Sequence, residues 1–259
     1  MNFDSFLNSI HVVEDDAVAT IPENWMQGRT AYGGLSAAFA LAAARRKISD
    51  AGPLRSAQIA FIGPLAGTIR ATVEVLRQGK SAAFVAVDVF GEAGLGLRAT
   101  FVFMRQRPSH VDFVEFAPPE HIPPAMSAPA FKRTAGPHFT GQFDYLHARD
   151  ADKPAEPSDF LRWVRLAEGP AVSTELELMV IGDALPPAAM GLMIEKGPVS
   201  SMNWTINIVS DAPSTREGWW LLKSRADQAQ HGGSSQSMAI WDADGRPVAI
   251  AIQSVALFT

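Results

Sequence analysis

The chain has 259 residues, of which 47% are hydrophobic and 19% are charged, and this balance is typical of a globular protein with a large core. A net charge of −5 offers no basic surface for a polyphosphate backbone, so we expect no nucleic-acid partner. The sequence contains no cysteine, which excludes disulfide bonds, a thiol nucleophile and thiolate metal ligands.

We expect no targeting or membrane-spanning segment. Its start, "MNFDSFLNSI", lacks a basic region followed by an apolar one. No stretch reaches the roughly 18 apolar residues that a membrane span needs. We therefore expect a cytoplasmic enzyme or binding protein.

The first clear element is a helix within residues 32–52, "YGGLSAAFALAAARRKISDAG". It follows Gly33 and Gly34, and it ends with the cations at 45–47 and with Gly52, which suit a helix C-terminus. The run is apolar nearly all round, so we expect other structure to surround it.

Four strand-like runs follow this helix, at residues 55–63, 68–77, 81–91 and 97–105. The joints between them, "PLAG", "QGK" and "EAGLG", are short and rich in turn residues, as between antiparallel neighbours. The first half therefore reads as one buried helix followed by an antiparallel meander.

The pattern breaks in a proline-rich stretch after residue 107. Paired prolines at 118–119 and 123–124 forbid regular elements there. A stretch of this length predicts a linker, or a strap that covers a surface. We predict an N-terminal domain at 1–107, a linker at 108–138 and a C-terminal domain at 139–259.

The same order of elements then recurs. Residues 160–166 read as a strand, a helix opens at Thr174, and four more strands follow at 199–209, 218–228, 234–242 and 248–258. The joint "DADGR" predicts a hairpin turn in the place of "EAGLG". The repetition predicts a tandem duplication of one fold unit.

Three stretches carry a family resemblance: "YGGLSAAFALAAA", "RQGKSAAFVAVDVF" and "DGRPVAIAIQSVALF". They resemble the two halves of the TesB-like, double-hotdog acyl-CoA thioesterases, over about residues 25–258. The resemblance implies an α+β tandem hotdog, with two antiparallel sheets each wrapped around a central helix. It also implies further pairing of such chains, so we expect a homo-oligomer.

The resemblance further implies an acyl-CoA thioesterase that uses an activated water and no covalent intermediate. Matched by position, the catalytic residues are Asp183, Ser201 and Gln253. Gly33 and Gly34 would offer backbone N–H groups to the oxyanion from the other half. No cofactor is implied, since coenzyme A belongs to the substrate, and no metal site is expected because no histidine pair has ligand spacing.

The chain departs from the family pattern near the hydroxyl. Ser201 stands where the family has Thr, and Asn203 stands where an acid is usual. The match to the family therefore leaves Ser200 and Ser201 as alternatives for the residue that supplies the hydroxyl.

The departures at Ser201 and Asn203 keep open a second function, that of a non-catalytic acyl-CoA-binding or lipid-binding hotdog protein. A hotdog hydratase or dehydratase is a further alternative, but it needs a helix-borne histidine, and neither predicted helix has one.

Asp183 is the residue that the local pattern marks most clearly. With Thr174 as N-cap and Glu177 as N3 of a capping box, helical spacing turns Asp183 toward the core. Burial raises the proton affinity of a carboxylate, as general-base work near neutral pH requires. The alternative interpretations without a catalytic role are a helix cap for Asp183, a solvent-facing side chain for Gln253 and a turn-forming residue for Ser201.

The first half offers no second site by the same matching. Leu41 falls near the position of Asp183, and Val102 falls near that of Gln253. Neither can move a proton, so we predict one site per chain. His231 lies in a glycine-rich loop, and Arg77 and Lys80 could meet phosphates, but solvation in a turn is the simpler interpretation for each.

Overall fold

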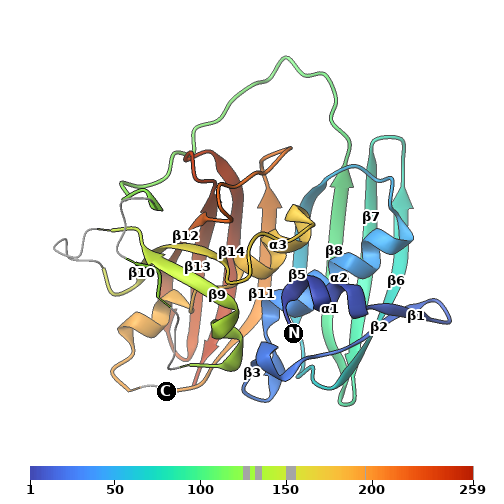
Figure 1. The fold of residues 1–259 in the computed structure, drawn as a ribbon, viewed down its shortest axis with the longest axis horizontal. Helices are drawn as coiled ribbons and strands as arrows, with labels where there is room; N and C mark the ends of the chain where they lie inside the picture. Colours follow the sequence, from blue (N-terminus) through green and yellow to red (C-terminus); the bar gives the residue numbers. More distant parts are fainter. Residues whose placement is uncertain (125–128, 132–135, 150–155, 196, 259) are drawn as a thin grey trace.

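The computed structural model describes residues 1–124, 129–131, 136–149, 156–195 and 197–258 (Figure 1). The helices are α1 (Phe3–Ser9), η1 (Glu23–Trp25), α2 (Gly33–Lys47), η3 (His138–Gln142), α3 (Thr174–Gly182) and η4 (Ala188–Leu192). The strands of the first half are β1 (His11–Val13), β2 (Asp16–Thr20), β3 (Met26–Gln27), β4 (Thr30–Ala31), β5 (Leu54–Phe61), β6 (Thr68–Gln78), β7 (Ala82–Gly91) and β8 (Gly94–Met104). Those of the second half are β9 (Phe143–His147), β10 (Asp159–Leu166), β11 (Val199–Ile208), β12 (Trp220–Gln230), β13 (Gly233–Trp241) and β14 (Pro247–Leu257).

The two half-sheets join edge to edge. Their strands form one 12-stranded sheet in the order β1-β2-β6-β7-β8-β5-β11-β14-β13-β12-β10-β9. β5 and β11 pair antiparallel at the junction, where Ile59 lies opposite Trp204. Each half keeps the predicted helix followed by four strands, so the tandem hotdog is observed with its two sheets fused into one.

The two long helices lie side by side on one face of this sheet (Figure 1). They run antiparallel, because the end of α2 meets the start of α3. There, Arg45 donates to both carboxylate oxygens of Glu175, at 2.5 and 2.7 Å. Such a bidentate pair fixes the relative placement of the helices. At the opposite end, the start of α2 faces the residue that follows α3.

The start of α3 differs by one residue from the prediction. The N-cap is Ser173, whose hydroxyl accepts the N–H of Leu176, and Thr174 is already helical. Glu177 is not part of a capping box. Its side chain turns inward and accepts hydrogen bonds from Ala171 and Trp220. The correction arises because two consecutive hydroxyl residues offer equivalent caps to sequence reasoning.

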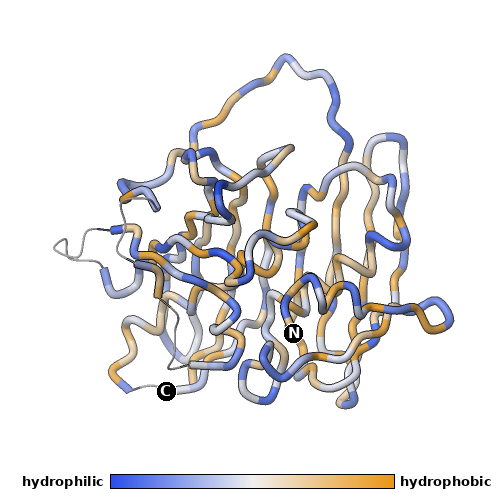
Figure 2. Tube along the Cα trace, viewed as in Figure 1, coloured by the Kyte–Doolittle hydropathy of each residue, from blue (hydrophilic) through white to orange (hydrophobic). Residues whose placement is uncertain are grey.

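Residues 109–115 of the proline-rich stretch are exposed, and residues 116–122 form a strap over the outer face of the second half. Side chains on that face form a separate cluster that includes Trp163 and Trp241. The two indole N–H groups donate to strap carbonyls, of Ile122 and Phe116 respectively. Phe116 also stacks on Trp241. Part of the predicted linker 108–138 lies outside the described residues. Figure 2 shows hydrophobic residues recurring along the strands of both halves.

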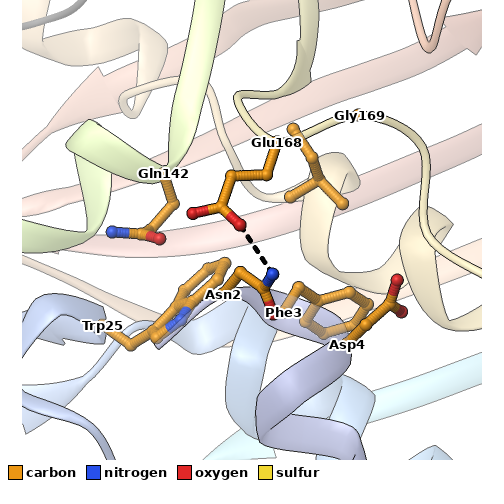
Figure 3. Close-up of a pocket in the computed structure, with 8 residues that line it drawn as sticks. Asn2, Phe3, Asp4, Trp25, Gln142, Glu168 and Gly169 are labelled. Carbon is orange, nitrogen blue, oxygen red and sulfur yellow. Dashed lines mark hydrogen bonds between the residues drawn. The ribbon is translucent and has the colours of Figure 1, made fainter.

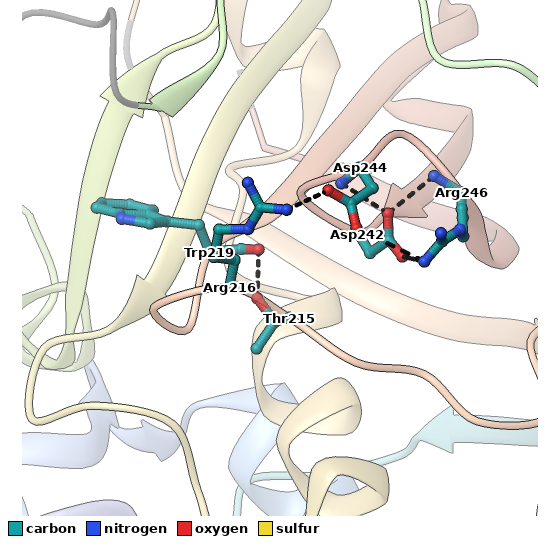
Figure 4. Close-up of polar contacts among 6 residues, drawn as sticks. All are labelled: Thr215, Arg216, Trp219, Asp242, Asp244 and Arg246. Atoms are coloured by element: carbon teal, nitrogen blue, oxygen red, sulfur yellow. Dashed lines mark hydrogen bonds and ion pairs between the residues drawn. The ribbon is translucent and has the colours of Figure 1, made fainter.

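The predicted "DADGR" hairpin is confirmed between β13 and β14. One carboxylate oxygen of Asp242 accepts the backbone N–H groups of Asp244 and Arg246, at 2.9 and 2.8 Å (Figure 4). Gly245 has φ +79, a conformation that suits glycine. Arg216 pairs with Asp244 and ties the hairpin to the neighbouring turn (Figure 4). No helix in the described part of the chain is long and apolar enough to cross a membrane.

Candidate active site

Asp183 lies at the C-terminal cap of α3, and two tyrosines hold the backbone around it. The Tyr32 hydroxyl donates to the carbonyl of Val180 at 2.7 Å, and the Tyr145 hydroxyl donates to that of Ala184 at 3.3 Å. These are the two tyrosines of the chain, and both are buried. The Val180 carbonyl is one that the end of α3 leaves without an intrahelical partner, and the Ala184 carbonyl follows the helix cap, so the position of Asp183 is fixed from both sides.

The Asp183 carboxylate has partners from both halves of the chain. From β14, Gln253 Nε2 donates to Oδ1 at 2.9 Å. From α2, the Gly34 backbone N–H donates to the same carboxylate. A side chain at Gly33 would not fit, because a Cβ there would lie 2.7 Å from Oδ2. The backbone at the start of α2 therefore lies in close contact with the carboxylate of Asp183, which belongs to the other half of the chain.

The environment raises the pKa of Asp183 to about 6. Burial is the main cause, and the hydrogen bonds from Gln253 and Gly34 partly oppose it. The two helix ends also act in opposite directions, since the C-terminus of α3 repels an anion and the N-terminus of α2 attracts it. A carboxylate with such a pKa is ionised at neutral pH and still accepts a proton readily.

Asp183 borders two cavities. The larger, of about 580 Å³, is lined by the β3–β4 hairpin, the start of α2, the segment after β5 and the start of β11. Arg29 and Asp183 are the charged residues among its lining. The smaller cavity, of about 100 Å³, is mostly apolar. Its lining includes Tyr32, Phe139, Leu185 and three prolines, at 137, 186 and 187. A molecule that fills both cavities would pass the carboxylate.

The other predicted residues lie at the same place. Ser201 lines both cavities and Gln253 lines the smaller one. Ser200 is exposed and lines the larger cavity. Ser201 also adjoins a β-bulge, since the register with β14 shifts between it and Asn203. The structure thus brings Asp183, Ser201, Gln253 and Gly33 together around one point.

Sequence reasoning missed Gln236. It lies on β13 and is 1% exposed, with Nε2 donating to Gln253 Oε1 at 2.6 Å. Its own Oε1 accepts the backbone N–H of Ala188 at 2.8 Å. A polar residue on a strand is usually predicted to face solvent, so a single sequence carries no signal for this buried amide.

Comparisons with known proteins agree with this architecture. Residues 21–104 match the family model for the acyl-CoA thioesterase N-terminal domain, and residues 119–257 match that for the acyl-CoA thioesterase C-terminal domain. The chain belongs to the acyl-CoA thioesterase family. It is therefore a thioester hydrolase of the TesB-like, double-hotdog kind. Among curated protein sequences, none is similar enough to count as a match.

Solved structures similar to this thioesterase share its fold over nearly the whole chain. A hot dog fold protein of unknown function from Alicyclobacillus acidocaldarius has 19% identity and a TM-score of 0.88, with 99% of this chain and 98% of that chain covered. A putative thioesterase II from Thermobifida fusca has 21% identity and a TM-score of 0.85, with 99% and 97% covered. A TesB protein of Mycobacterium avium subs paratuberculosis has 13% identity and a TM-score of 0.80, with 99% and 98% covered.

The first half of the thioesterase has apolar residues where the second half has its polar ones. Leu41 is fully buried on α2. Val102, the predicted counterpart of Gln253, is only partly buried and alternates with the buried side chains of β8, which are Leu97, Ala99, Phe101 and Phe103, so it faces the other side of the strand. The inward side chains of β8 are therefore all apolar and offer no proton acceptor.

The remaining candidates lie away from Asp183. His231 occupies a tight hairpin turn between β12 and β13 with φ +53. Arg77 lies on β6 and Lys80 in the turn after it, and neither lines the two cavities at Asp183. Among the described residues, no group of three or more His, Asp or Glu side chains is placed to hold a metal ion.

A separate cavity of about 40 Å³ lies between the chain start and the segment after β10 (Figure 3). Glu168 accepts a hydrogen bond from Asn2 Nδ2 at 2.6 Å there (Figure 3). This exposed contact ties α1 to the second half of the chain. Because this hydrogen bond is exposed, whereas the Asp183 carboxylate is buried between the two halves, we assign the Asn2–Glu168 contact a structural role.

Proposed function

We propose that Asp183 is the general base that activates water for hydrolysis of the acyl-CoA thioester. Water attacks the thioester carbonyl carbon as Asp183 takes its proton. The tetrahedral intermediate then collapses, the C–S bond breaks with its electron pair on sulfur, and Asp183 returns the proton to the CoA thiolate. The products are a free acid and CoA, and no cofactor takes part. The raised pKa of Asp183 beside two cavities is the observation that carries the proposal.

The neighbours of Asp183 have separate roles in this proposal. Ser201 holds the attacking water, in preference to Ser200, because it lines both cavities whereas Ser200 lines the larger one. Gln253 orients the carboxylate through its hydrogen bond to Oδ1. The Gly33 N–H serves the oxyanion, because the Gly34 N–H is directed to Asp183. Each chain then has one site, built from both halves.

The two cavities suit the two ends of the substrate. The larger one, with Arg29 at its exposed hairpin, suits the coenzyme A arm, whose phosphates are anionic. The smaller, apolar one suits the acyl group. Arg29 therefore replaces Arg77 and Lys80 as our candidate for phosphate binding. The domain boundaries at 1–107 and 139–259, a homo-oligomer and a cytoplasmic location stay predictions.

The test is release of CoA from a panel of acyl-CoAs, followed with a thiol reagent. The chain has no cysteine, so the reagent reports CoA without a background from the protein. We expect hydrolysis by the wild type and a large loss in Asp183→Asn. If Asp183→Asn keeps the wild-type rate, Asp183 is not the base. If no acyl-CoA is hydrolysed but one binds, the chain is an acyl-CoA-binding hotdog.

A hydratase or dehydratase is disfavoured by the same cavities. Such hotdog enzymes use a helix-borne histidine, and α2 and α3 contain none. No histidine lines either cavity at Asp183. Incubation with an enoyl-CoA, followed by its ultraviolet absorbance, is expected to show no hydration of the double bond.

A further inference from the structure

Three buried groups form a hydrogen-bonded chain that ends on Asp183. The Ala188 N–H donates to Gln236 Oε1 at 2.8 Å, Gln236 Nε2 donates to Gln253 Oε1 at 2.6 Å, and Gln253 Nε2 donates to Asp183 Oδ1 at 2.9 Å. Gln236 and Gln253 are 1% and 2% exposed. Little water is therefore available to replace any member of the chain.

The direction of this chain is set at its far end. A backbone N–H can only donate, so the group of Gln236 that faces Ala188 must be its carbonyl oxygen. The amide of Gln236 then has to turn its NH2 toward Gln253. In the same way, Gln253 has to turn its NH2 toward Asp183. One backbone group thus fixes the orientation of two amides.

We propose that Gln236 is a positioning residue of the thioesterase, which holds the amide of Gln253 with its NH2 group toward Asp183. The inference rests on the proposed function of Asp183. Gln236 lines neither cavity at Asp183, so it acts through Gln253 and not on the substrate. Without it, Gln253 is free to turn its oxygen toward the carboxylate. Two acceptors would then face each other, and the carboxylate would favour its protonated form.

The first test is Gln236→Met, which keeps the length of the side chain and removes the amide. We expect kcat to fall roughly 10- to 100-fold with little change in KM, because the base is misplaced while the binding cavities are intact. The acidic limb of the profile of kcat/KM against pH should also move above its wild-type position. Gln228→Met is the matched control, since Gln228 is exposed on the neighbouring β12.

The second test is Gln236→Glu, which retains an acceptor for the Ala188 N–H. While the new carboxyl is protonated, it can still donate to Gln253 and replace the amide. Once the new carboxyl ionises, it can no longer donate to Gln253, and the Gln253 amide should reverse its orientation. We therefore expect a descending limb at higher pH that the wild type lacks. This variant also keeps the proposal testable if Gln236→Met does not fold.

The outcomes separate the two proposals. Loss of rate in either Gln236 variant without any movement of the pH limbs would make Gln236 a structural residue and overturn the inference. A wild-type rate and pH profile in both variants would overturn it as well. Full activity in Asp183→Asn, measured in the same assay, would instead show that the assignment of the base is wrong, and the role of Gln236 would fall with it.

Discussion

Two carboxylates of the second half, Glu177 within α3 and Asp183 at its end, both have a pKa raised by burial but differ in access to the cavities. Glu177 is 1% exposed, and its oxygens accept from the Trp220 indole and the Ala171 N–H at 2.9 and 2.8 Å. It lines neither of the cavities that Asp183 borders. Burial therefore does not by itself make a catalytic acid; access to a substrate separates the two.

The largest expected effect is that of Asp183→Asn on turnover. The amide keeps the size of the side chain and an acceptor for Gly34, but it cannot take a proton. We expect kcat to fall about 10²- to 10⁴-fold. In the wild type, kcat/KM should rise tenfold per pH unit below about 6 and level off above it, because Asp183 must be ionised. A profile that is flat through this range would contradict the assignment.

The same variant should be more stable than the wild type at neutral pH. A carboxyl with a raised folded pKa stabilises the protein below its unfolded pKa, and this contribution is lost as pH rises through the folded value. The advantage of Asp183→Asn should therefore grow between pH 4 and 6, to at most about 3 kcal/mol. Urea unfolding at several pH values measures it. A constant difference across this range would show that the pKa is not raised.

Gly33→Ala tests whether access depends on the shape of the α2 start. The added Cβ would lie 2.7 Å from Asp183 Oδ2 and 3.1 Å from the Phe61 ring, so the carboxylate has to move. We expect kcat to fall roughly 10- to 100-fold, with the fold retained. Gly141→Ala is the matched control, since a Cβ there meets nothing within 4 Å. Equal rates in the two variants would contradict the close approach.

Arg29→Ala tests the orientation of the substrate between the cavities. The KM for acyl-CoA should rise about 2- to 5-fold, the worth of an exposed ion pair, and the effect should weaken in high salt. The KM for the acyl thioester of N-acetylcysteamine, which lacks the phosphates, should not change. Arg77→Ala is the control, because Arg77 lines neither cavity. The reverse pattern in the two variants would restore Arg77 as the phosphate ligand.

The sequence predicted the strands and central helices well, because alternation and apolar runs are local signals. It missed the short helix α1, the short strands β1, β2 and β9 at the sheet edges, and the separate β3–β4 pair. The fusion of the sheets through β5 and β11 was not predicted either, since strand pairing between distant segments leaves no periodic mark. Short elements depend on tertiary contacts more than on their own pattern.

Within the candidate site, the residues named from the family resemblance meet around one point, and those that support them were missed. Tyr32 and Tyr145 bind backbone carbonyls, and Gln236 binds a backbone N–H. A side chain that serves the backbone of a distant segment has no spacing rule in the sequence. The proximity of Gly33 to Asp183 was expected from the family resemblance, in which the helix start of one hotdog unit faces the acid of the other. The structure provides it through the antiparallel pair of α2 and α3, which brings the start of one helix to the end of the other.

The smallest expected effect on turnover is that of Glu177→Gln, and it completes the comparison. Glu177 has no route to substrate, so kcat and KM should stay at their wild-type values. Stability should respond instead. Because the pKa of Glu177 is raised in the folded protein, its carboxyl stabilises the fold below the pKa of the unfolded state. This stabilisation is lost as pH rises through the pKa of the folded state. The free energy of unfolding of Glu177→Gln, measured in urea at several pH values, should therefore lack the decrease with rising pH that Glu177 causes in the wild type. If a folded Glu177→Gln loses activity as Asp183→Asn does, access to the cavities is not what distinguishes the two acids.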